Sequence, residues 1–367
     1  MKKLLLSCAM ACFAFAAGAQ GIYQFAYPGF EGDWRSDEEP GNGWNSFPSA
    51  VGSMAGLGKG SSPKPQKVEG HNSSVAVKIF SKSILGKKAN GNLTTGRINM
   101  GSMTPANSAN YNYTDRSSSD NSLRFAGRPD AVSFYAKFTP GAGNQARGQF
   151  ILHDDCDYRD PEISDQSGNR VGKASVLIDA CTDWTKYEGA FTYDKNSTPE
   201  VQYLLGSFTT NPTPGGSKGD ELIIDDIHFI YYSTLRGVLY DPATIDFKED
   251  VYNYTVDAEY SAIDFYCTTK GKGATKELSY DENTGVLTVT VKGNDISVNP
   301  NNYTVYTFTF KTDSGTTDPD PDPNPDPDPD PDPEVKPLGT PVATLAELSN
   351  TETYAVYNDT YTAYLIY

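Results

Sequence analysis

Cysteine, histidine and tryptophan are scarce in this sequence, and their scarcity excludes several classes of protein. The 367 residues include five Cys, three His and three Trp. Cys8 and Cys12 lie in the N-terminal segment, which leaves Cys156, Cys181 and Cys267. Three cysteines exclude a complete disulfide framework. The sequence leaves two readings open, a single Cys156–Cys181 bridge or three small buried thiols.

Catalytic and metal-binding motifs are also missing. His71, His153 and His228 are too far apart in the sequence for a metal-ligand spacing, and no zinc-protease, serine-hydrolase, phosphate-loop or dinucleotide motif occurs. Basic residues are outnumbered, with 30 Lys and Arg against 47 Asp and Glu and a net charge of −17. Nucleic-acid binding needs clustered Lys and Arg, so we expect no nucleic-acid partner.

Long apolar runs are absent after the first twenty residues. Lys2 and Lys3 precede the apolar run 4–16, and the small residues 17–19 complete a secretory signal peptide over residues 1–19. No later run approaches the roughly 20 apolar residues of a membrane-spanning helix. We therefore expect an exported protein without a membrane span, located outside the cell, at its surface or in the periplasm.

The composition predicts an all-β protein of several parts. Gly 33, Pro 24, Tyr 24 and Phe 17 indicate many turns and many β-favouring aromatic residues. Changes in composition predict a jelly-roll domain over 20–232, a smaller immunoglobulin-like or cadherin-like sandwich over 233–312, an Asp-Pro spacer over 313–337, and the start of a β-domain over 338–367.

The third and fourth parts differ sharply in pattern. Asp-Pro and Asn-Pro dipeptides repeat from 318 to 333, and each proline holds its neighbour extended, which predicts a stiff polyproline II spacer. The phrase ETYAVYNDTYTAYLIY then predicts a hairpin about Asn358-Asp359. Because the chain ends within an alternating pattern, we expect this last domain to be truncated.

The second part contains three alternating segments, VYNYTV, VLTVTV and VYTFTF, with the turn DENTG between strands. Short strands of period two with regular turns predict an immunoglobulin-like sandwich. The segment FKEDVYNYTVDAEY resembles the cadherin-like β-sandwich repeats of exported bacterial proteins. This part has no histidine, and we expect it to serve as a spacer or packing module.

Eight strand candidates fall in the first part. They are the opening run FEGDW, LTTGRI, RFAGRPDAVSFYAKF, GQFILHD, KASVLID, YEGAFTY, VQYLLGSF and LIIDDIHF. Strand alternation predicts one face with Val132, Phe134 and Ala136, and the opposite face with Ser133, Tyr135 and Lys137. Such a set of strands indicates a jelly roll.

The last of these strands carries two adjacent carboxylates. Alternation places Asp225 in phase with Ile223, Ile227 and Phe229 on the apolar face, and Asp226 in phase with His228. A carboxylate on an apolar face costs several kcal/mol unless it is hydrogen-bonded, paired or bound to a cation. We therefore expect a partner for this charge.

The segments LTTG at 93–96, FAGRPD at 125–130 and LIIDD at 222–226 resemble a carbohydrate-metabolism domain family of exported proteins from glycan-degrading gut bacteria. The resemblance covers most of residues 21–232 and implies a jelly-roll fold joined to immunoglobulin-like modules. The Asp-rich segment HDDCDYRDPE after Phe150 departs from the family pattern. The resemblance therefore assigns no site residues in this segment.

A broader resemblance concerns jelly-roll carbohydrate-binding modules, which begin with Phe-Glu and end with an Asp-containing strand. In those modules the two acids hold a structural calcium ion. The matching residues are Glu31 and Asp225, and other oxygens would complete the six to eight ligands of calcium. The alternative is that Asp225 accepts hydrogen bonds from backbone donors at a bend. No other cofactor is expected.

Sugar binding would need aromatic rings that stack on pyranose faces and polar groups for the hydroxyls. We expect these ligand-binding residues in polar, loop-like surroundings: Trp44, Tyr111, Tyr113, Arg128, Asp130, Tyr158 and Trp184. A glycosidase would need two carboxylates roughly 5 to 10 Å apart. The weak catalytic candidates are Asp154, Asp155, Asp157 and Glu162, with Asp160 in the same segment.

Three functions remain consistent with these patterns. The first is a non-catalytic glycan-binding or glycan-processing accessory protein of a polysaccharide-utilisation system, with a polysaccharide or oligosaccharide ligand and surface glycan-uptake proteins as partners. The second is a glycoside hydrolase using the acids after Phe150. The third is a structural or adhesive surface protein whose sandwiches act as spacers.

Overall fold

The computed structural model describes residues 22–72, 74–142, 144–194, 200–241, 245–311, 354–357 and 363–366. The predicted signal peptide and Asp-Pro spacer lie outside these residues. By its contacts the chain divides into a unit of residues 1–313 and a unit of residues 314–367. In the described part of the chain, no helix is long and apolar enough to cross a membrane.

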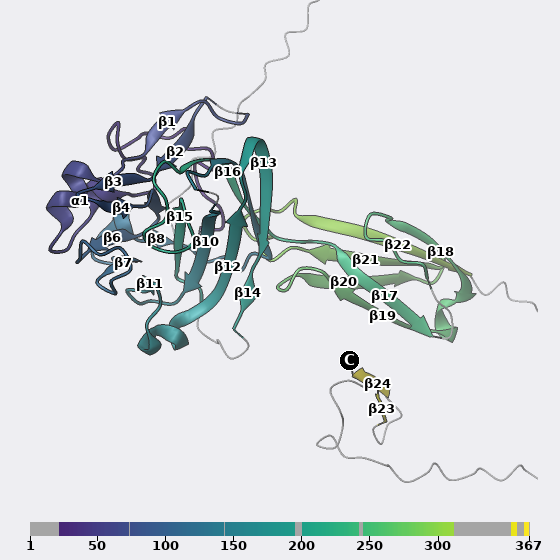
Figure 1. The fold of residues 1–367 in the computed structure, drawn as a ribbon. Coiled ribbons are helices and arrows are strands. Elements are labelled where there is room, and N and C mark those ends of the chain that lie inside the picture. The colour runs from purple at the N-terminus through teal and green to yellow at the C-terminus, as the bar shows by residue number, and fades with distance from the viewer. Residues whose placement is uncertain are drawn as a thin grey trace, which may run out of the picture. The chain divides into compact units, whose positions relative to one another are not determined.

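The first domain is a jelly-roll sandwich of two antiparallel sheets (Figure 1). One sheet has the strand order β1 (Gln66–Val68), β2 (Ala76–Phe80), β16 (Glu221–Ile230), β9 (Ala131–Thr139) and β13 (Cys181–Ala190). The other has the order β14 (Thr192–Tyr193), β12 (Arg170–Ile178), β10 (Ala146–His153), β15 (Tyr203–Thr209) and β5 (Asn92–Thr94), with β8 (Leu123–Arg124) also paired to β15.

Smaller elements surround the second of these sheets. They are the three-stranded sheet of β11 (Arg159–Asp160), β7 (Asn110–Tyr113) and β6 (Arg97–Met100), the hairpin of β3 (Lys82–Ile84) and β4 (Lys87–Ala89), and the helix α1 (Ala55–Ser61). Single 3-10 turns occur at η1 (Phe47–Ser49), η2 (Ser119–Asn121) and η3 (Ser164–Asn169).

The core lies between the two large sheets. The predicted inward residues Val132, Phe134 and Ala136 of β9 are all buried in it. Phe208 of β15 meets Phe134 and Phe150 edge to face, with ring centroids 5.0 and 5.6 Å apart. This alternation is confirmed for β9, and it leaves the opposite faces of both sheets for polar side chains.

The opening run was predicted as a strand, and this prediction is wrong. Phe30 has a φ of +66°, a left-handed conformation that ends any extended run. Its ring is buried in the core beside Trp44, with centroids 5.8 Å apart. The predicted segments of this domain also leave out β1, β2, β3, β4, β7 and β11.

A β-bulge in β16 corrects the predicted phase of Asp225. Asp225 pairs with Tyr135 and His228 with Ser133, so one extra residue lies between these pairs. Asp226, with a φ of +51°, supplies the kink. Asp225 therefore shares the outer face with Ile223, and only the residues beyond the bulge, Ile227 and Phe229 among them, return to the core.

The two threonines of the segment LTTG hydrogen-bond to the backbone of β15. Thr95 is fully buried, donates its hydroxyl to the Leu204 carbonyl at 2.7 Å and accepts the Gly206 N–H at 2.8 Å. Thr94 donates to the Gly206 carbonyl at 2.9 Å. A side chain at Gly96 would put its Cβ 2.2 Å from the Tyr113 carbonyl oxygen, so only glycine fits there.

The second domain is a smaller sandwich. It pairs β17 (Leu235–Asp241) with β19 (Asp264–Thr269), and orders β18 (Asn253–Glu259), β22 (Tyr303–Lys311), β21 (Val286–Lys292) and β20 (Thr275–Asp281) in a second sheet, with η4 at Tyr260–Ala262. Leu287, Val289 and Val291 are buried with Tyr306, Phe308 and Phe310. The three alternating segments predicted here are confirmed as β18, β21 and β22.

In the last unit the structure describes two strands, β23 (Tyr354–Tyr357) and β24 (Ala363–Ile366). They pair antiparallel, with Tyr354 opposite Ile366. The predicted antiparallel pairing is confirmed, and the predicted turn at Asn358-Asp359 lies outside the described residues.

We predict that Thr95→Val lowers the free energy of unfolding by about 1–3 kcal/mol, because it leaves a buried carbonyl and a buried N–H without the hydroxyl. Urea denaturation would measure the change. Thr192→Val, at an exposed position of β14, is the matched control and should change stability by less than about 0.5 kcal/mol. Equal effects of both variants would contradict this account.

Candidate functional site

A pocket of about 210 Å³ lies on the outer face of the six-stranded sheet. Arg147 of β10 and Thr209 of β15 reach it, because their neighbours in each strand point into the core. The β6–β7 pair, the β3–β4 hairpin and the loop after β15 form its other walls. Phe47, Ile98 and Met100 pack together and supply an apolar side.

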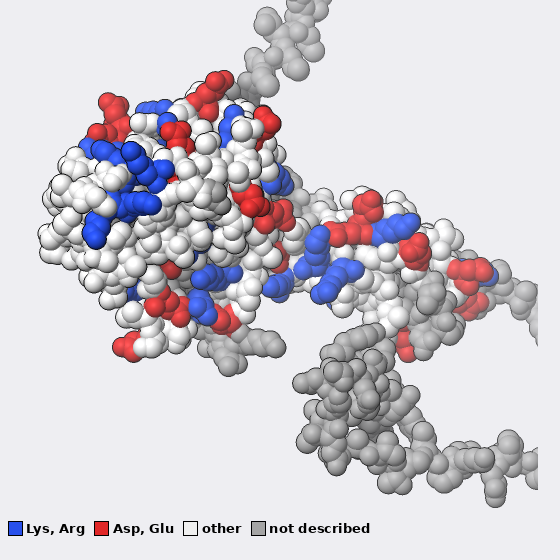
Figure 2. Space-filling view, in the orientation of Figure 1, with Lys and Arg blue, Asp and Glu red and all other residues white. Residues whose placement is uncertain are grey.

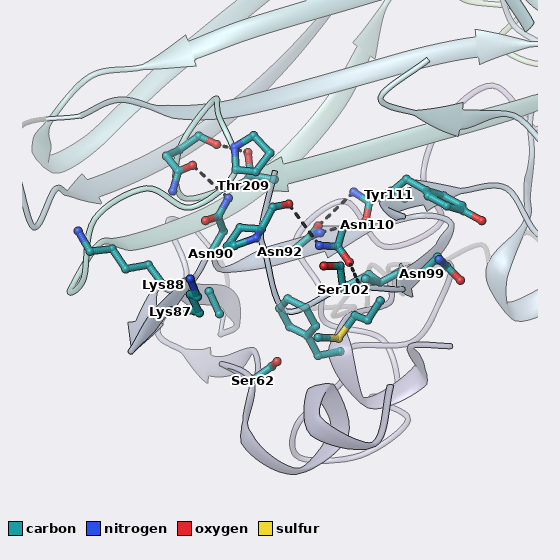
Figure 3. Close-up of a pocket in the computed structure, with 18 of the residues that line it drawn as sticks. Ser62, Lys87, Lys88, Asn90, Asn92, Asn99, Ser102, Asn110, Tyr111 and Thr209 are labelled. Carbon is teal, nitrogen blue, oxygen red and sulfur yellow. Dashed lines mark hydrogen bonds between the residues drawn. The ribbon is translucent and has the colours of Figure 1, made fainter. Parts of the chain in front are cut away.

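Asparagine side chains are the main polar lining of this pocket: Asn90, Asn92, Asn99, Asn110, Asn112 and Asn211. Asn92 and Asn112 exchange two amide hydrogen bonds, at 3.0 and 3.2 Å, and Asn90 donates to Asn211 at 3.0 Å. These bonds hold the amides in fixed orientations. Figure 3 shows Asn90, Asn92 and Asn110 between Lys87 and Lys88 on one side and Tyr111 on the other.

Two of the lining residues carry buried donors without a hydrogen-bond partner, Arg147 Nε and Asn211 Nδ2. Gln149 Nε2, two residues beyond Arg147 on the same face of β10, is a third. A buried donor left unpaired costs about 1–3 kcal/mol. Water or a ligand oxygen in the pocket would offset this cost.

The acidic segment after Phe150 forms ion pairs with arginines of neighbouring segments. Arg116 contacts Asp157 at 2.8 Å and Asp155 at 3.2 Å. Asp154 accepts two bonds from the Asn169 amide, at 3.0 and 2.8 Å.

The remaining two acids of this segment are also paired. Glu162 contacts Arg170 at 2.6 Å and accepts the Tyr158 hydroxyl. Asp160 is the one carboxylate that lines the pocket, and it lies 3.4 Å from Arg147. The catalytic candidates therefore do not place two carboxylates across this pocket.

Two of the predicted stacking platforms are core residues instead. Trp44 is 2% exposed and packs on Phe25, with ring centroids 5.2 Å apart. Tyr158 is fully buried against Ile151 and Leu205 on the outer face of the six-stranded sheet. The ligand-binding role predicted for both is wrong, because a ring without exposed surface cannot stack on a sugar.

The predicted pair Arg128 and Asp130 has a structural setting. Asp130 is 6% exposed and accepts the backbone N–H groups of Tyr232 at 2.8 Å and Lys272 at 2.7 Å. The Arg128 guanidinium lies over the Tyr193 ring, 5.7 Å from its centroid. Asp130 thus ties the end of the first domain to a loop of the second, and its prediction as a ligand-binding residue is wrong.

The other predicted rings lie on different faces of the sandwich. Tyr111 lines the pocket, and the Arg159 guanidinium stands 3.9 Å from its centroid. Tyr113 meets Tyr111 edge to face at 5.6 Å, and burial raises its pKa. Trp184 lies on the outer face of the five-stranded sheet with Lys137 and His71, so it cannot share a site with Tyr111.

Glu31 and Asp225 lie close together, as the sequence pattern suggested. A Cβ built on Gly29 would lie 2.3 Å from Glu31 Oε1 and 2.8 Å from Asp225 Oδ1. Asp225 is fully buried and accepts the backbone N–H groups of His71 at 2.6 Å and Asp226 at 2.8 Å. Both readings of Asp225, a calcium ligand and a hydrogen-bonded bend residue, agree with these contacts.

The ligand atoms of His153, Asp154 and Cys156 lie within 4.8 Å of one another. His153 has no exposed surface, and both its ring nitrogens are hydrogen-bonded, Nδ1 to the Asp154 carbonyl and Nε2 to Thr114, each at 2.8 Å. Burial, followed by the bond to Asp154, raises the pKa of Cys156 to about 12. Both imidazole nitrogens of His153 are thus engaged in hydrogen bonds of the fold.

Cys156, Cys181 and Cys267 are free thiols. Cys156 packs beside Tyr158, whereas Cys181 begins β13 in the other sheet and contacts the Ala136 carbonyl at 3.6 Å. Of the two readings that the sequence left open, the one without a Cys156–Cys181 bridge is the one observed, with Cys267 buried and the other two thiols partly buried.

The pocket asparagines were missed by the sequence analysis, although a signal was present. Asn90 and Asn92 stand two residues apart, as do Asn110 and Asn112 on β7. Two residues apart in a strand means one face, which holds for Asn110 and Asn112, whereas Asn90 lies between β4 and β5. Which two segments meet was not readable, because about 20 residues separate them.

No protein-family model matches the chain, and no curated protein matches it. Solved structures with some likeness include carbohydrate-binding modules and glycoside hydrolases.

Three of these structures illustrate how distant the likeness is. The module TmCBM61 in complex with β-1,4-galactotriose is 14% identical, covering 55% of this chain and 92% of its own, at a TM-score of 0.27. A GlcNAcα1-4Gal-releasing endo-β-galactosidase from Clostridium perfringens is 12% identical, covering 79% and 82%, at 0.31. A cyclase from Fischerella sp. TAU is 10% identical, covering 55% and 92%, at 0.29. TM-scores this low say nothing about what this chain does.

The burial of His153 predicts a pH dependence of stability. Burial lowers the pKa of His153 from 6.5 to about 4, against the opposing effect of Asp154. Because the folded-state pKa is the lower one, the neutral ring contributes its full stability above pH 6.5, and that contribution is lost as the pH falls towards 4. We expect a loss of up to about 3 kcal/mol over this window.

Urea denaturation between pH 4 and 8 would test this, with His153→Gln as the comparison. The difference in stability between the wild-type protein and the variant should shrink as the pH falls below 6.5. A difference that stays constant across the window would exclude the assignment.

Proposed function

We propose that the protein is a non-catalytic carbohydrate-binding protein whose ligand enters the asparagine-lined pocket. The observation that carries this proposal is the pocket itself: oriented amides, an apolar side and a single carboxylate that is already paired. Sugar hydroxyls both donate and accept hydrogen bonds, and asparagine amides do the same. The apolar side would contact the C–H face of a sugar ring.

The size of the pocket limits how much of a saccharide it can hold. Sites for drug-sized ligands measure about 300–1,000 Å³, so a pocket of about 210 Å³ suits a chain end or a short segment rather than a long oligosaccharide. Tyr111 stands at the rim, where a following sugar residue would contact its ring edge.

Binding is favoured over hydrolysis by the state of the carboxylates. A glycosidase needs an acid and a second carboxylate about 5–10 Å apart across the substrate. The pocket offers Asp160 alone among its lining residues, and Arg147 neutralises it. The signal peptide read from the sequence supports an exported accessory role in glycan utilisation, outside the cell or in the periplasm, beside glycan-uptake proteins.

We predict that Asn92→Ala with Asn112→Ala weakens glycan binding at least about tenfold, because two oriented amides are lost. A glycan array would identify a bound polysaccharide, and titration calorimetry would compare the variants on it. Asn253→Ala with Asn301→Ala, in the second sandwich, is the matched control and should bind as the wild-type protein does.

The same polysaccharides would be incubated with the wild-type protein and the released reducing sugar measured. Sugar release would contradict the non-catalytic assignment. Binding that survives the loss of both asparagines would contradict the choice of pocket.

We also propose that Glu31 and Asp225 hold a structural calcium ion. Their oxygens approach one point beside Gly29, where a Cβ would clash, and carboxylate oxygens are the ligands calcium prefers. Two carboxylates this close repel each other, and a cation between them removes the repulsion. Bound calcium would join the N-terminal segment to the bulge of β16.

Removing calcium with EGTA should lower the melting temperature by several degrees, because a ligand at 100 times its dissociation constant stabilises the native state by about 2.7 kcal/mol. Glu31→Gln should lose this response, whereas Asp33→Asn, an exposed acid two residues away, should keep it. A melting curve that EGTA leaves unchanged would support the alternative, in which Asp225 is a hydrogen-bonded bend residue.

A further inference from the structure

A cluster of basic side chains borders the pocket on an otherwise acidic protein. Lys82, Lys87 and Lys88 belong to the β3–β4 hairpin, and all three are exposed. Lys87 and Lys88 line the pocket. Figure 2 shows basic side chains gathered over the part of the surface where Figure 1 places β3 and β4.

The hairpin presents these lysines from a fixed backbone. Its two-residue turn has Leu85 at a φ of +48° and Gly86 at +77°, the signs of a type I′ turn, which matches the twist of the strands. Ile84 pairs with Lys87 directly after the turn. In the described ranges, no carboxylate lies within 4.0 Å of either Lys87 or Lys88, so their charge is not neutralised within the fold.

The charge balance of the lining is opposite to that of the chain. Lys87, Lys88 and Arg147 face a single carboxylate, Asp160, in a protein of net charge −17. A concave site lined by one sign of charge concentrates ligands of the other sign. Lys87 and Lys88 are consecutive residues of β4, so their side chains leave the hairpin on opposite faces and each brings a positive charge to the pocket border separately.

We propose that the pocket binds an anionic saccharide, whose acidic group contacts Lys87 and Lys88 while its hydroxyls contact the asparagines. This inference rests on the proposed function and names its ligand class. Arg147 Nε and Asn211 Nδ2, the unpaired donors, supply further hydrogen bonds deeper in the pocket. The acidic group is a carboxylate or a sulfate ester, since an ammonium group acts as a point charge and binds either anion.

The test uses two matched pairs of polymers with the wild-type protein. The first pair is polygalacturonate and its carboxyl-reduced form, and the second is carrageenan and its desulfated form. Titration calorimetry at two salt concentrations gives the affinities. We expect one acidic polymer to bind at least about tenfold more tightly than its neutral partner, with an affinity that falls as salt rises.

Variants that remove charge test whether the preference for acidic polymers comes from the lysines of the β3–β4 hairpin. Lys87→Gln with Lys88→Gln should weaken binding of the acidic polymer about fivefold to tenfold, so that its advantage over the neutral partner disappears. Lys186→Gln with Lys311→Gln removes the same charge from exposed positions elsewhere and should leave the affinity at the wild-type value. Thermal melting would show that both variants are folded.

The outcomes separate the inference from the function beneath it. Equal affinity for acidic and neutral partners, lowered by the Asn92 and Asn112 substitutions, would overturn the anionic ligand and keep the proposed function. An acidic preference that both lysine pairs reduce equally would overturn the role of the hairpin. No binding to any of the four polymers, or to a glycan array, would overturn the proposed function and the inference together.

Discussion

Between the two large sheets, Phe208 meets Phe134 and Phe150 edge to face, with ring centroids 5.0 and 5.6 Å apart, and the rings of Phe134 and Phe150 are tilted at 41° with centroids 6.5 Å apart. Aromatic rings in this arrangement bury a large apolar area and attract one another through their quadrupoles. Because the layer fills the space between the sheets, every polar side chain of these strands must lie on an outer face. Both candidate sites follow from this constraint, the pocket on the six-stranded sheet and the Glu31–Asp225 pair on the five-stranded sheet.

The bulge in β16 keeps the charge of Asp225 out of the apolar core. Without the extra residue at Asp226, either the carboxylate of Asp225 or the rings beyond it would face the wrong side. With the bulge, Asp225 lies outside the core under the N-terminal segment, where backbone N–H groups bind it. The positive φ of Asp226 is the conformational cost of this arrangement.

Ion pairing distinguishes charged residues that stabilise the fold from charged residues that can bind a ligand. Four of the acids after Phe150 pair with Arg116, Arg147 or Arg170, and Asp154 accepts hydrogen bonds from Asn169, which makes that loop a scaffold for the outer face of the sheet. At the pocket mouth the balance reverses, with Lys87 and Lys88 unmatched by any nearby carboxylate in the described structure. A polar, acidic ligand would accept hydrogen bonds from the unsatisfied donors inside the pocket and pair with the cations at its mouth.

The sequence by itself determined the all-β class, most strands of the two large sheets, three strands of the second sandwich and the inward face of β9, because period-two alternation is a local property that any register must obey. It also indicated that Glu31 and Asp225 meet, through a resemblance rather than through alternation. Exposure was not readable: Trp44 and Tyr158 lie among polar residues in the sequence but are buried by segments far away in the chain. The phase of Asp225 was misread because one residue in a left-handed conformation reverses the alternation beyond it. Only the tertiary structure decided that Asn92 meets Asn112, that Arg147 reaches Asp160 and that Lys87 and Lys88 border the pocket, since these contacts depend on strand pairing between distant segments and not on any local pattern.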